Sequence, residues 1–463
     1  ARWLAAHTAT CEATHVRRSQ APALMDRRMH CLDQRRDELE ALLRVFMAAD
    51  VDVVQHAVAA AAALPAPESC VELIARADDE DLSADPTRLA AVAEQRRRLA
   101  AAHAESDAGH YAAARTIAEE VLATAEALAD RPLRAAARSA LGDVQVHLTD
   151  YAAAEQNLAA AFFDALALAR DDLAVDSGIG LAKLVGDQLA RPAEGRLWAR
   201  HVDALLDRKG HNPGDDIDYL TAIGNIATRG GEYPAAEAAF RDALARAEAM
   251  QPGHDLALAD VLVSLAGVLG ITGKAAEALA LETRALALRE AALGPLHPDL
   301  GLILTNLGVG HMLLGEFALA EQAQRRTLEI WRLSMPPGHE RLAFPLSALG
   351  DLALERGRFL EARADFDEAL AIWDKTLGPG HPSALFMQER LATTLLLQGE
   401  REAALRHIER ALAGWGEMAE PDPGGLTLAL LTRAQLAITV GDYSTAREPI
   451  ERARRTADGD QIG

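Results

Sequence analysis

Six glycine residues recur at one constant step along the second half of the chain. They are Gly231, Gly273, Gly315, Gly357, Gly399 and Gly441, and their spacing defines a 42-residue unit. Six positions in one strict register do not arise by chance, so this part of the sequence is a repeated unit. A unit of this kind stacks on copies of itself, and it constrains the fold more than any other feature of the chain.

The residues around each glycine predict a pair of packed helices. Alanine stands five residues after it, and in several copies an aromatic residue stands two residues after it. Seven residues before it, five copies carry a small residue: Gly224, Ala266, Gly308, Gly350 and Ala392. A small residue lets the first helix touch the second, and glycine adopts the left-handed conformation that ends the first helix. We expect the aromatic residue and the alanine to pack back into the gap.

The composition favours helices throughout. Hydrophobic residues make up 50% of the 463 residues, but aromatic residues make up only 4%. Alanine and leucine, in which the chain is rich, are strong helix formers, whereas Val, Ile and aromatic residues favour strands. An all-β fold is therefore excluded. We expect an all-α protein, a right-handed α-solenoid of stacked helical hairpins.

Four segments differ in how well they keep the repeat. Residues 1–85 lack it and are expected to form helices over about 2–18, 22–48 and 50–63. Residues 86–206 contain weaker hairpins, the best of them around Gly142 and Tyr151, where Thr149 replaces the turn glycine. Residues 207–456 are the regular 42-residue repeats. Residues 457–463 are a tail that we expect to be disordered.

The repeat resembles the tetratricopeptide repeat, whose signature is the alternation of small and large residues described above. The unit in that family is usually shorter, and a 42-residue unit resembles the version found in kinesin light chains. The segments Leu293–Pro298 and Leu377–Pro382 between repeats are similar to that subtype as well. The resemblance implies a non-catalytic module that binds a protein or peptide in a concave groove.

The N-terminal segment, residues 1–85, contains all three cysteines, Cys11, Cys31 and Cys70. No C-x-x-C pair is present, so a zinc site is disfavoured, and buried free thiols or a disulfide between two of them remain open. This segment resembles the region that follows the catalytic domain in large serine/threonine protein kinases of the myxobacterial type. That resemblance implies the regulatory or sensory region of a bacterial kinase, across the membrane from the kinase domain, with cysteines that could be oxidised.

The alternative is a free-standing scaffold or adaptor that assembles a multiprotein complex. The two hypotheses also differ in location, which would be extracytoplasmic for a region attached to a membrane-spanning kinase and otherwise cytoplasmic. Because the chain begins Ala-Arg-Trp inside an expected helix, we expect it to be part of a longer polypeptide.

Charge and motifs exclude several classes of function. The net charge is −22, which disfavours binding to nucleic acid or to an anionic membrane. No apolar run is long enough to span a membrane as a helix. The chain lacks the phosphate loop, catalytic loop and D-F-G of a kinase and other catalytic motifs, so we expect no enzymatic activity, cofactor or metal.

Two groups of residues could be mistaken for metal sites. His254, His297, His339 and His381 recur between repeats, but helices about 10 Å apart cannot bring them to one ion. We expect these histidines to cap or pack the loops. The cluster Asp78-Asp79-Glu80-Asp81 lacks the alternating spacing of a calcium loop, and we expect a solvated linker.

The candidate binding residues follow from the repeat register, which places four positions of each first helix on the concave side. The middle repeats offer apolar residues there, and the flanking repeats offer polar and acidic ones, which fits a neutral or basic peptide with apolar anchors. Asn225 is expected to hold a peptide backbone and Arg229 an acidic group. Lysine is absent from these positions, so we expect no clamp for a chaperone tail. The candidates are Asp218, Thr221, Asn225, Arg229, Asp260, Thr305, Met312, Phe344, Ser347, Asp351, Phe386 and Glu389.

Overall fold

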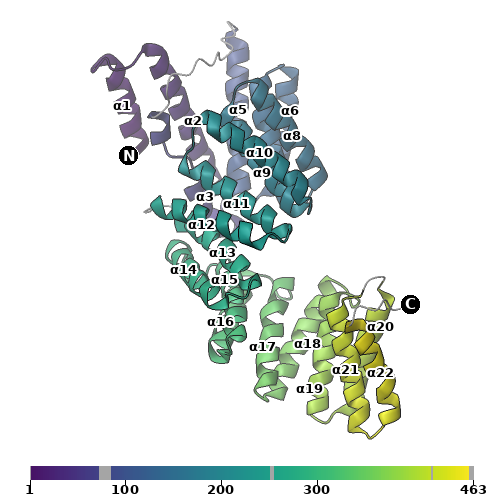
Figure 1. Cartoon of the computed structure of the whole chain (residues 1–463). Helices are drawn as coiled ribbons and strands as arrows, with labels where there is room; N and C mark the ends of the chain where they lie inside the picture. Colours follow the sequence, from purple (N-terminus) through teal and green to yellow (C-terminus); the bar gives the residue numbers. More distant parts are fainter. Residues whose placement is uncertain (1, 72–84, 251–254, 419–420, 458–463) are drawn as a thin grey trace. The chain divides into compact units, whose positions relative to one another are not determined.

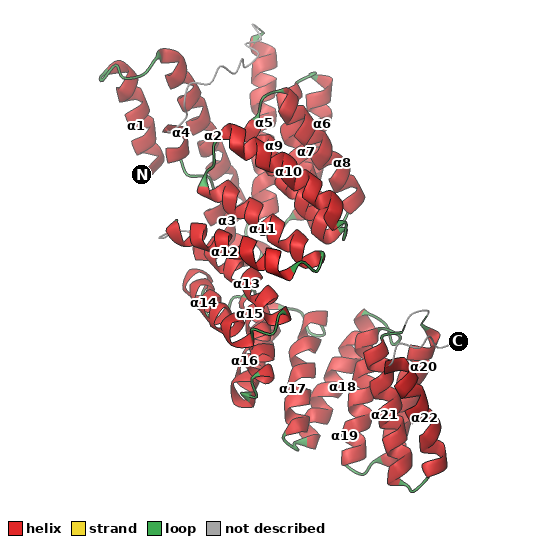
Figure 2. Cartoon of the chain, in the orientation of Figure 1, coloured by secondary structure: helices red, strands yellow, loops and turns green. Residues whose placement is uncertain are grey.

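A computed structural model describes residues 2–71, 85–250, 255–418 and 421–457. Within these ranges the regular secondary structure is helical, and no strand is found (Figure 2). The expected all-α fold class is confirmed. The acidic cluster at residues 78–81, His254 and the end of the predicted tail lie outside the described residues.

The chain divides into two compact units, which are described separately: unit 1 spans residues 1–273 and unit 2 spans residues 274–463. Figure 1 labels their helices along the chain. The helices of unit 1 are α1 (Arg2–His15), α2 (Pro22–Met47), α3 (Val51–Ala63), α4 (Glu68–Val71), α5 (Pro86–Asp107), α6 (Tyr111–Ala127), α7 (Arg131–His147), α8 (Tyr151–Ala167), α9 (Asp171–Lys183) with the π-helical turn η1 (Leu184–Gln188), α10 (Pro192–Lys209), α11 (Pro213–Arg229), α12 (Tyr233–Ala249) and α13 (Asp255–Ile271). Those of unit 2 are α14 (Ala275–Leu293), α15 (Leu300–Leu313), α16 (Phe317–Ser334), the 3-10 turn η2 (Glu340–Leu342), α17 (Ala343–Glu355), α18 (Phe359–Thr376), α19 (Pro382–Leu397), α20 (Arg401–Glu417), α21 (Pro423–Thr439) and α22 (Tyr443–Ala457).

Consecutive helices pack in pairs, as expected for a solenoid of hairpins. In unit 1 the pairs are α5 with α6, α7 with α8, α9 with α10 and α11 with α12, and in unit 2 they are α15 with α16, α17 with α18, α19 with α20 and α21 with α22. The first helices of successive hairpins also contact one another, from α5 through α7, α9 and α11 to α13, and from α17 through α19 to α21. These first helices therefore form a continuous face from α5 to α13 in unit 1 and from α17 to α21 in unit 2.

The turn residues adopt the conformation that the sequence predicts. All six glycines of the 42-residue series have positive φ, between 72° and 84°. In the weaker hairpins, residues with side chains take the same left-handed conformation: Ala129, Thr149, Ala169 and Ala190, with φ between 51° and 59°. A left-handed backbone is unfavourable for such residues, which explains why these hairpins are harder to recognise in the sequence.

The small residue of each first helix faces a large residue of the second. A Cβ added to Gly224 would lie 2.5 Å from the ring of Phe240, and one added to Gly350 would lie 2.4 Å from the ring of Phe366. The two rings are almost fully buried, as is the alanine five residues after the turn. The close approach of the paired helices is confirmed as the feature that holds each hairpin together.

The aromatic residues after the turns behave differently from the prediction. Phe317 is 41% exposed and Tyr443 is 72% exposed, so these two rings do not fill the gap between their helices. The gap is closed instead by the alanines three positions further on, Ala320 and Ala446, which are buried. Because an alanine at this position lets the helices meet, no ring is needed between them.

The N-terminal segment forms the expected helices and is closed by a disulfide. Cys31 in α2 is bonded to Cys70 in α4, with the two Cα atoms 5.6 Å apart, and Cys11 is a free thiol. Beside the bond, Leu32 is fully buried, and its carbonyl accepts a hydrogen bond from Trp3 Nε1 at 2.6 Å. Of the two possibilities that the sequence left open, the structure contains the disulfide. Among the described residues, no helix is long and apolar enough to cross a membrane.

The substitution Gly350→Ala is expected to lower the free energy of unfolding by about 1–2 kcal/mol. The added methyl group must displace Phe366, and the cost of overpacking exceeds the gain of about 1 kcal/mol from replacing glycine in a helix. The control is Gly416→Ala in α20, where a Cβ meets nothing within 4 Å and stability should rise. Denaturant unfolding measures both, and equal effects of the two substitutions would refute the role of the close contact.

Protein purified and then denatured without reductant is expected to show a single reactive thiol, that of Cys11. Reduction should lower the stability of the N-terminal segment by roughly 4 kcal/mol, because the bond closes a loop of about 40 residues. A thiol titration and a melting curve with and without reductant measure this. Three reactive thiols would contradict the disulfide.

Candidate peptide-binding groove

Three successive first helices of unit 1 each carry an exposed aspartate whose pKa is raised. Asp143 lies in α7, Asp176 in α9 and Asp218 in α11, and we call these three residues the aspartate column. All three side chains are exposed. Below them, the hydroxyls of Ser139 and Ser177 are buried and lie 3.0 Å apart, which joins α7 to α9.

The carboxyl groups of the column hold their protons unusually tightly. The pKa of Asp143 is raised to about 7 and that of Asp176 to about 7, and the pKa of Asp218 is raised as well. The main cause is desolvation, because the surrounding helices displace much of the water around each group. Repulsion adds to it: Asp176 raises the pKa of Asp143, and Asp172, Asp215 and Asp218 raise that of Asp176.

Two lysines oppose this repulsion. Lys183 lowers the pKa of Asp143 and Asp218, and Lys209 lowers that of Asp176. Lys209 already contacts Asp172 and pairs with Asp215, with 2.6 Å between its Nζ and Asp215 Oδ2. Desolvation and carboxylate repulsion raise the pKa of these aspartates more than the two lysines lower it. The aspartate column therefore has too little positive charge nearby to balance its carboxylates.

The predicted groove residues of unit 1 lie on α11 and α13. Asp218, Arg229 and Asp260 are exposed or half-exposed, and Thr221 and Asn225 are partly buried. Asn225 makes no side-chain hydrogen bond with another described residue, whereas both Nε and Nη2 of Arg229 lie within 3.1 Å of Asp187 Oδ1. An acidic group on a partner would therefore have to compete with Asp187 for Arg229.

In unit 2, three of the predicted groove residues line one hollow of about 230 Å³. Ser347 and Asp351 come from α17 and Phe386 from α19, and the remaining lining residues are Trp373, Ser383, Met387 and Arg390. We call this hollow the Trp373 pocket. The Nε atom of Arg390 lies 3.0 Å from Asp351 Oδ1, so the one acidic side chain of the lining is paired.

The other predicted residues of unit 2 lie elsewhere or face inward. Thr305 donates its hydroxyl to Gly301 O of its own helix at 2.7 Å, and Met312 is partly buried. Phe344 is 51% exposed beside the Trp373 pocket. Glu389 is only 1% exposed, and its Oε1 accepts hydrogen bonds from Thr393 and Thr432 at 2.8 and 2.7 Å. Glu389 therefore joins α19 to α21 rather than presenting a charge to solvent.

A comparison with protein families identifies the repeats of the second half. A sequence model described as "Tetratricopeptide repeat" matches residues 256–333 and 339–417. These two segments are tetratricopeptide repeats. A search of curated proteins found no match to the sequence.

Several solved structures of repeat proteins are similar to parts of the chain. A putative kinesin light chain of Podosopora anserina with nearly identical TPR-like repeats has 20% sequence identity and a TM-score of 0.40, over 45% of this chain and 97% of that one. A tetratricopeptide repeat protein of Parabacteroides merdae has 16% identity and a TM-score of 0.40, over 65% and 93%. The pilF protein of Pseudomonas aeruginosa has 18% identity and a TM-score of 0.38, over 53% and 94%.

The loop histidines of the tetratricopeptide repeats cap helices, as the sequence predicts. The Nδ1 atoms of His339 and His381 accept hydrogen bonds from the backbone of Arg341 and Ser383, both at 3.2 Å. His297 accepts one from the backbone of Asp299 at 3.3 Å. These contacts satisfy amide groups at helix starts, where no intrahelical acceptor exists.

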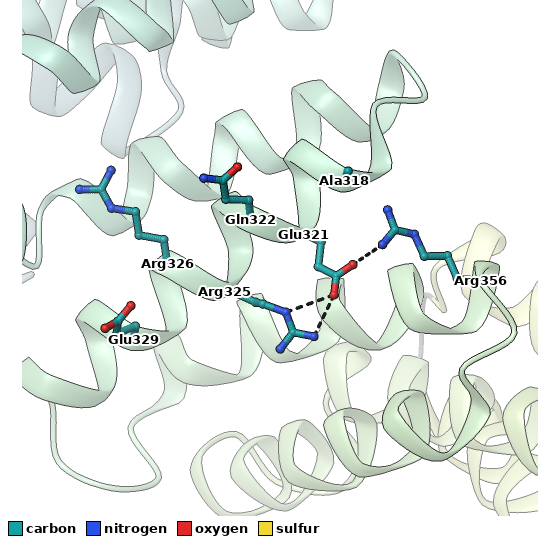
Figure 3. Close-up of a pocket in the computed structure, with 7 residues that line it drawn as sticks. All are labelled: Ala318, Glu321, Gln322, Arg325, Arg326, Glu329 and Arg356. Atoms are coloured by element: carbon teal, nitrogen blue, oxygen red, sulfur yellow. Dashed lines mark hydrogen bonds and ion pairs between the residues drawn. The ribbon is translucent and has the colours of Figure 1, made fainter.

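In two further clusters of charged residues, the side chains already pair with one another or with neighbouring residues. A hollow of about 530 Å³ lies along α16, where Figure 3 shows the carboxylate of Glu321 between the guanidinium groups of Arg325 and Arg356. Asp50, Asp52 and His110 offer ligand atoms within 4.8 Å of one another. Asp50 caps α3, however, and His110 pairs with both Asp50 and Glu105, so we assign neither cluster to a ligand.

Sequence reasoning missed Asp143, Asp176 and Trp373. The first two lie in hairpins that lack the turn glycine, and the groove positions were counted only in the regular repeats. Asp143 directly follows the contact residue Gly142, so the same count would have reached it, whereas the hairpin of Asp176 is too degenerate in sequence to count. Trp373 lies in a second helix, but a signal was present, because Trp331, Trp373 and Trp415 recur at the same step as the turn glycines. A side chain from the second helix that reaches between two first helices can still line the groove.

The substitution Asp143→Asn is expected to stabilise the protein at pH 8 more than at pH 5. A folded pKa above the unfolded one means that stability is lost as the pH rises from about 4 to about 7, and the neutral amide avoids that loss. The melting temperature of the variant relative to the unmodified protein measures the effect at each pH. A gain that does not depend on pH would contradict the raised pKa.

Proposed function

We propose that this chain is a non-catalytic protein-binding module that holds a basic segment of a partner protein along the aspartate column of unit 1. The carrying observation is that exposed aspartates stand on the successive first helices α7, α9 and α11, and the neighbouring carboxylates together with desolvation raise the pKa of Asp143 and Asp176. Ionised carboxylates there repel one another and have lost part of their water. A lysine or arginine side chain of a ligand supplies the missing positive charge.

The surroundings strengthen this attraction. An ion pair in a partly desolvated groove is stronger than one in bulk water, because less water screens the charges. A bound cation favours the ionised carboxylate and therefore lowers the pKa of Asp143 and Asp176. Binding of a basic segment should consequently release protons near pH 7 and should tighten as the pH rises through this range.

We further propose that the chain is the regulatory or sensory region of a bacterial serine/threonine protein kinase. Two observations support this: the resemblance of residues 1–85 to the segment that follows such kinase domains, and the Cys31–Cys70 disulfide. Disulfides persist mainly in oxidising compartments outside the cytoplasm, where such a sensory region would lie. A kinase domain and a membrane helix encoded directly upstream of Ala1 are expected. A start codon there would contradict this assignment and favour the free-standing scaffold.

Binding of fluorescein-labelled peptides tests the ligand class. At pH 8 and low salt, fluorescence anisotropy should show binding of the repeating peptide Lys-Leu-Ala but not of Glu-Leu-Ala. The double substitution Asp143→Asn and Asp176→Asn should weaken the binding of the basic peptide about 10-fold or more, as expected for the loss of ~1.4 kcal/mol or more of attraction.

The matched control keeps the same net charge. Asp242→Asn in α12 and Asp367→Asn in α18 remove two exposed carboxylates from second helices, and binding should be nearly unchanged. Equal weakening by both pairs of substitutions would show that net charge alone, and not the aspartate column, attracts the peptide.

A further inference from the structure

The Trp373 pocket of unit 2 contains polar groups that the fold leaves without partners. Trp373 is 4% exposed, and its Nε1 has no hydrogen-bond acceptor among the described residues. A buried N–H group without an acceptor costs roughly 1–3 kcal/mol, so such a group calls for an explanation. Trp373 lines the pocket, so a ligand bound there would contact the residue that carries this unpaired donor.

The preceding repeat shows what the indole would otherwise do. Trp331 occupies the equivalent position one repeat earlier, and its Nε1 donates to Pro298 O at 3.0 Å. The residue equivalent to Pro298 is Glu340, which begins the 3-10 turn η2 that leads into α17. The entry into the first helix differs between the two repeats, and the donor of Trp373 is left without its internal acceptor.

Other donors converge on the same pocket. Arg390 directs Nε towards Asp351, and its two terminal amino groups make no hydrogen bond with a described residue. The side-chain hydroxyls of Ser347 and Ser383 also make no hydrogen bond with a described residue. The hydrogen-bonding groups around the pocket that lack a partner are therefore mostly donors.

The remaining walls are apolar. Phe386 and Met387 line the pocket, and Phe344 lies edge-on to Trp373 with 5.5 Å between ring centroids. A hollow of about 230 Å³ is smaller than the roughly 300–1,000 Å³ of typical small-molecule sites, and it suits one side chain. The carboxylates of Asp351 and the buried Glu389 already lie beside Arg390, so the pocket does not favour a negatively charged ligand side chain.

We infer that the Trp373 pocket binds one apolar side chain of an extended partner segment, whose backbone carbonyl accepts a hydrogen bond from Trp373 Nε1. This inference rests on the proposed function, since the partner is a protein segment, and it assigns the apolar anchor to named residues. The Nε1 atom is buried in the free protein, so this hydrogen bond requires the side chains around the indole to shift when the segment binds. Apolar contact supplies affinity, and the single donor fixes the backbone direction.

The test observes the indole N–H signals of the ¹⁵N-labelled full chain, which has five tryptophans. The probe is N-acetyl-leucine methylamide, with N-acetyl-alanine methylamide and N-acetyl-glutamate methylamide as comparisons. The Trp373 signal, assigned with Trp373→Phe, should move downfield and saturate with the leucine probe and shift much less with the other two. The signal of Trp331 should stay in place, because its Nε1 has an acceptor. Trp415 is the sharper comparison, because its Nε1 also lacks an acceptor among the described residues but it does not line the pocket; its ring centroid lies 5.6 Å from that of Phe386, and its signal should shift much less than that of Trp373.

Substitutions separate the pocket from the rest of the molecule. Ser347→Phe fills the pocket and should abolish the shift while the melting temperature stays close to that of the unmodified protein. Three results would each overturn the inference. The Trp373 signal could fail to shift at the highest probe concentration, all tryptophan signals could shift equally, or the shift could persist in a folded Ser347→Phe variant.

The two proposals can fail independently. The double variant Asp143→Asn and Asp176→Asn should lose the basic peptide and keep the leucine-probe shift at Trp373. If the unmodified protein binds no basic peptide but shows that shift, the ligand charge proposed for unit 1 is wrong and the pocket stands. If the basic peptide binds and Trp373 does not respond, the pocket assignment is wrong and the proposed function stands.

Discussion

The two helices of each hairpin approach so closely that only glycine or alanine fits at their contact, and the rest of the fold depends on this approach. Gly224 against Phe240 and Gly350 against Phe366 show the same arrangement in the two units. Because each hairpin is held by the same contact, successive hairpins stack in the same way. Their first helices then present equivalent positions along one face, which is how a repeated sequence becomes a binding surface.

The same regularity explains part of the electrostatics of that surface. Asp176 and Asp218 occupy equivalent positions 42 residues apart, whereas Asp143 lies at a different position of its first helix, and Asp176 still raises the pKa of Asp143. In unit 1 the repulsion is only partly offset by Lys183 and Lys209, and the pKa values of Asp143 and Asp176 rise. In unit 2 Asp351 is paired with Arg390, which opposes the rise that desolvation causes in its pKa, and the half-exposed ring of Phe344 lies beside it over the buried Trp373. The two units therefore offer different chemistry to a protein ligand, one electrostatic and one apolar.

Much of the fold follows from the sequence, because the signals are local. The turn glycines, the small contact residues and the capping histidines each act within one hairpin, and the structure confirms them. Three residues that the count along the repeat predicted for the groove, Ser347, Asp351 and Phe386, line one pocket in the structure. The count could not show that Glu389 is buried, since that depends on Thr432 of the next hairpin. It also missed Asp143 and Asp176, whose hairpins have Thr149 and Ala190 in place of the turn glycine, because the count was applied only to the regular repeats.

The proton balance of binding tests the central claim most directly, namely that the aspartate column recognises a basic segment. Calorimetric titration of the Lys-Leu-Ala peptide at pH 7, in buffers of different ionisation enthalpy, measures the number of protons exchanged. The account predicts a net release of protons, because the bound cation lowers the raised pKa of Asp143 and Asp176. Binding of the peptide with no proton release, or with proton uptake, would contradict it.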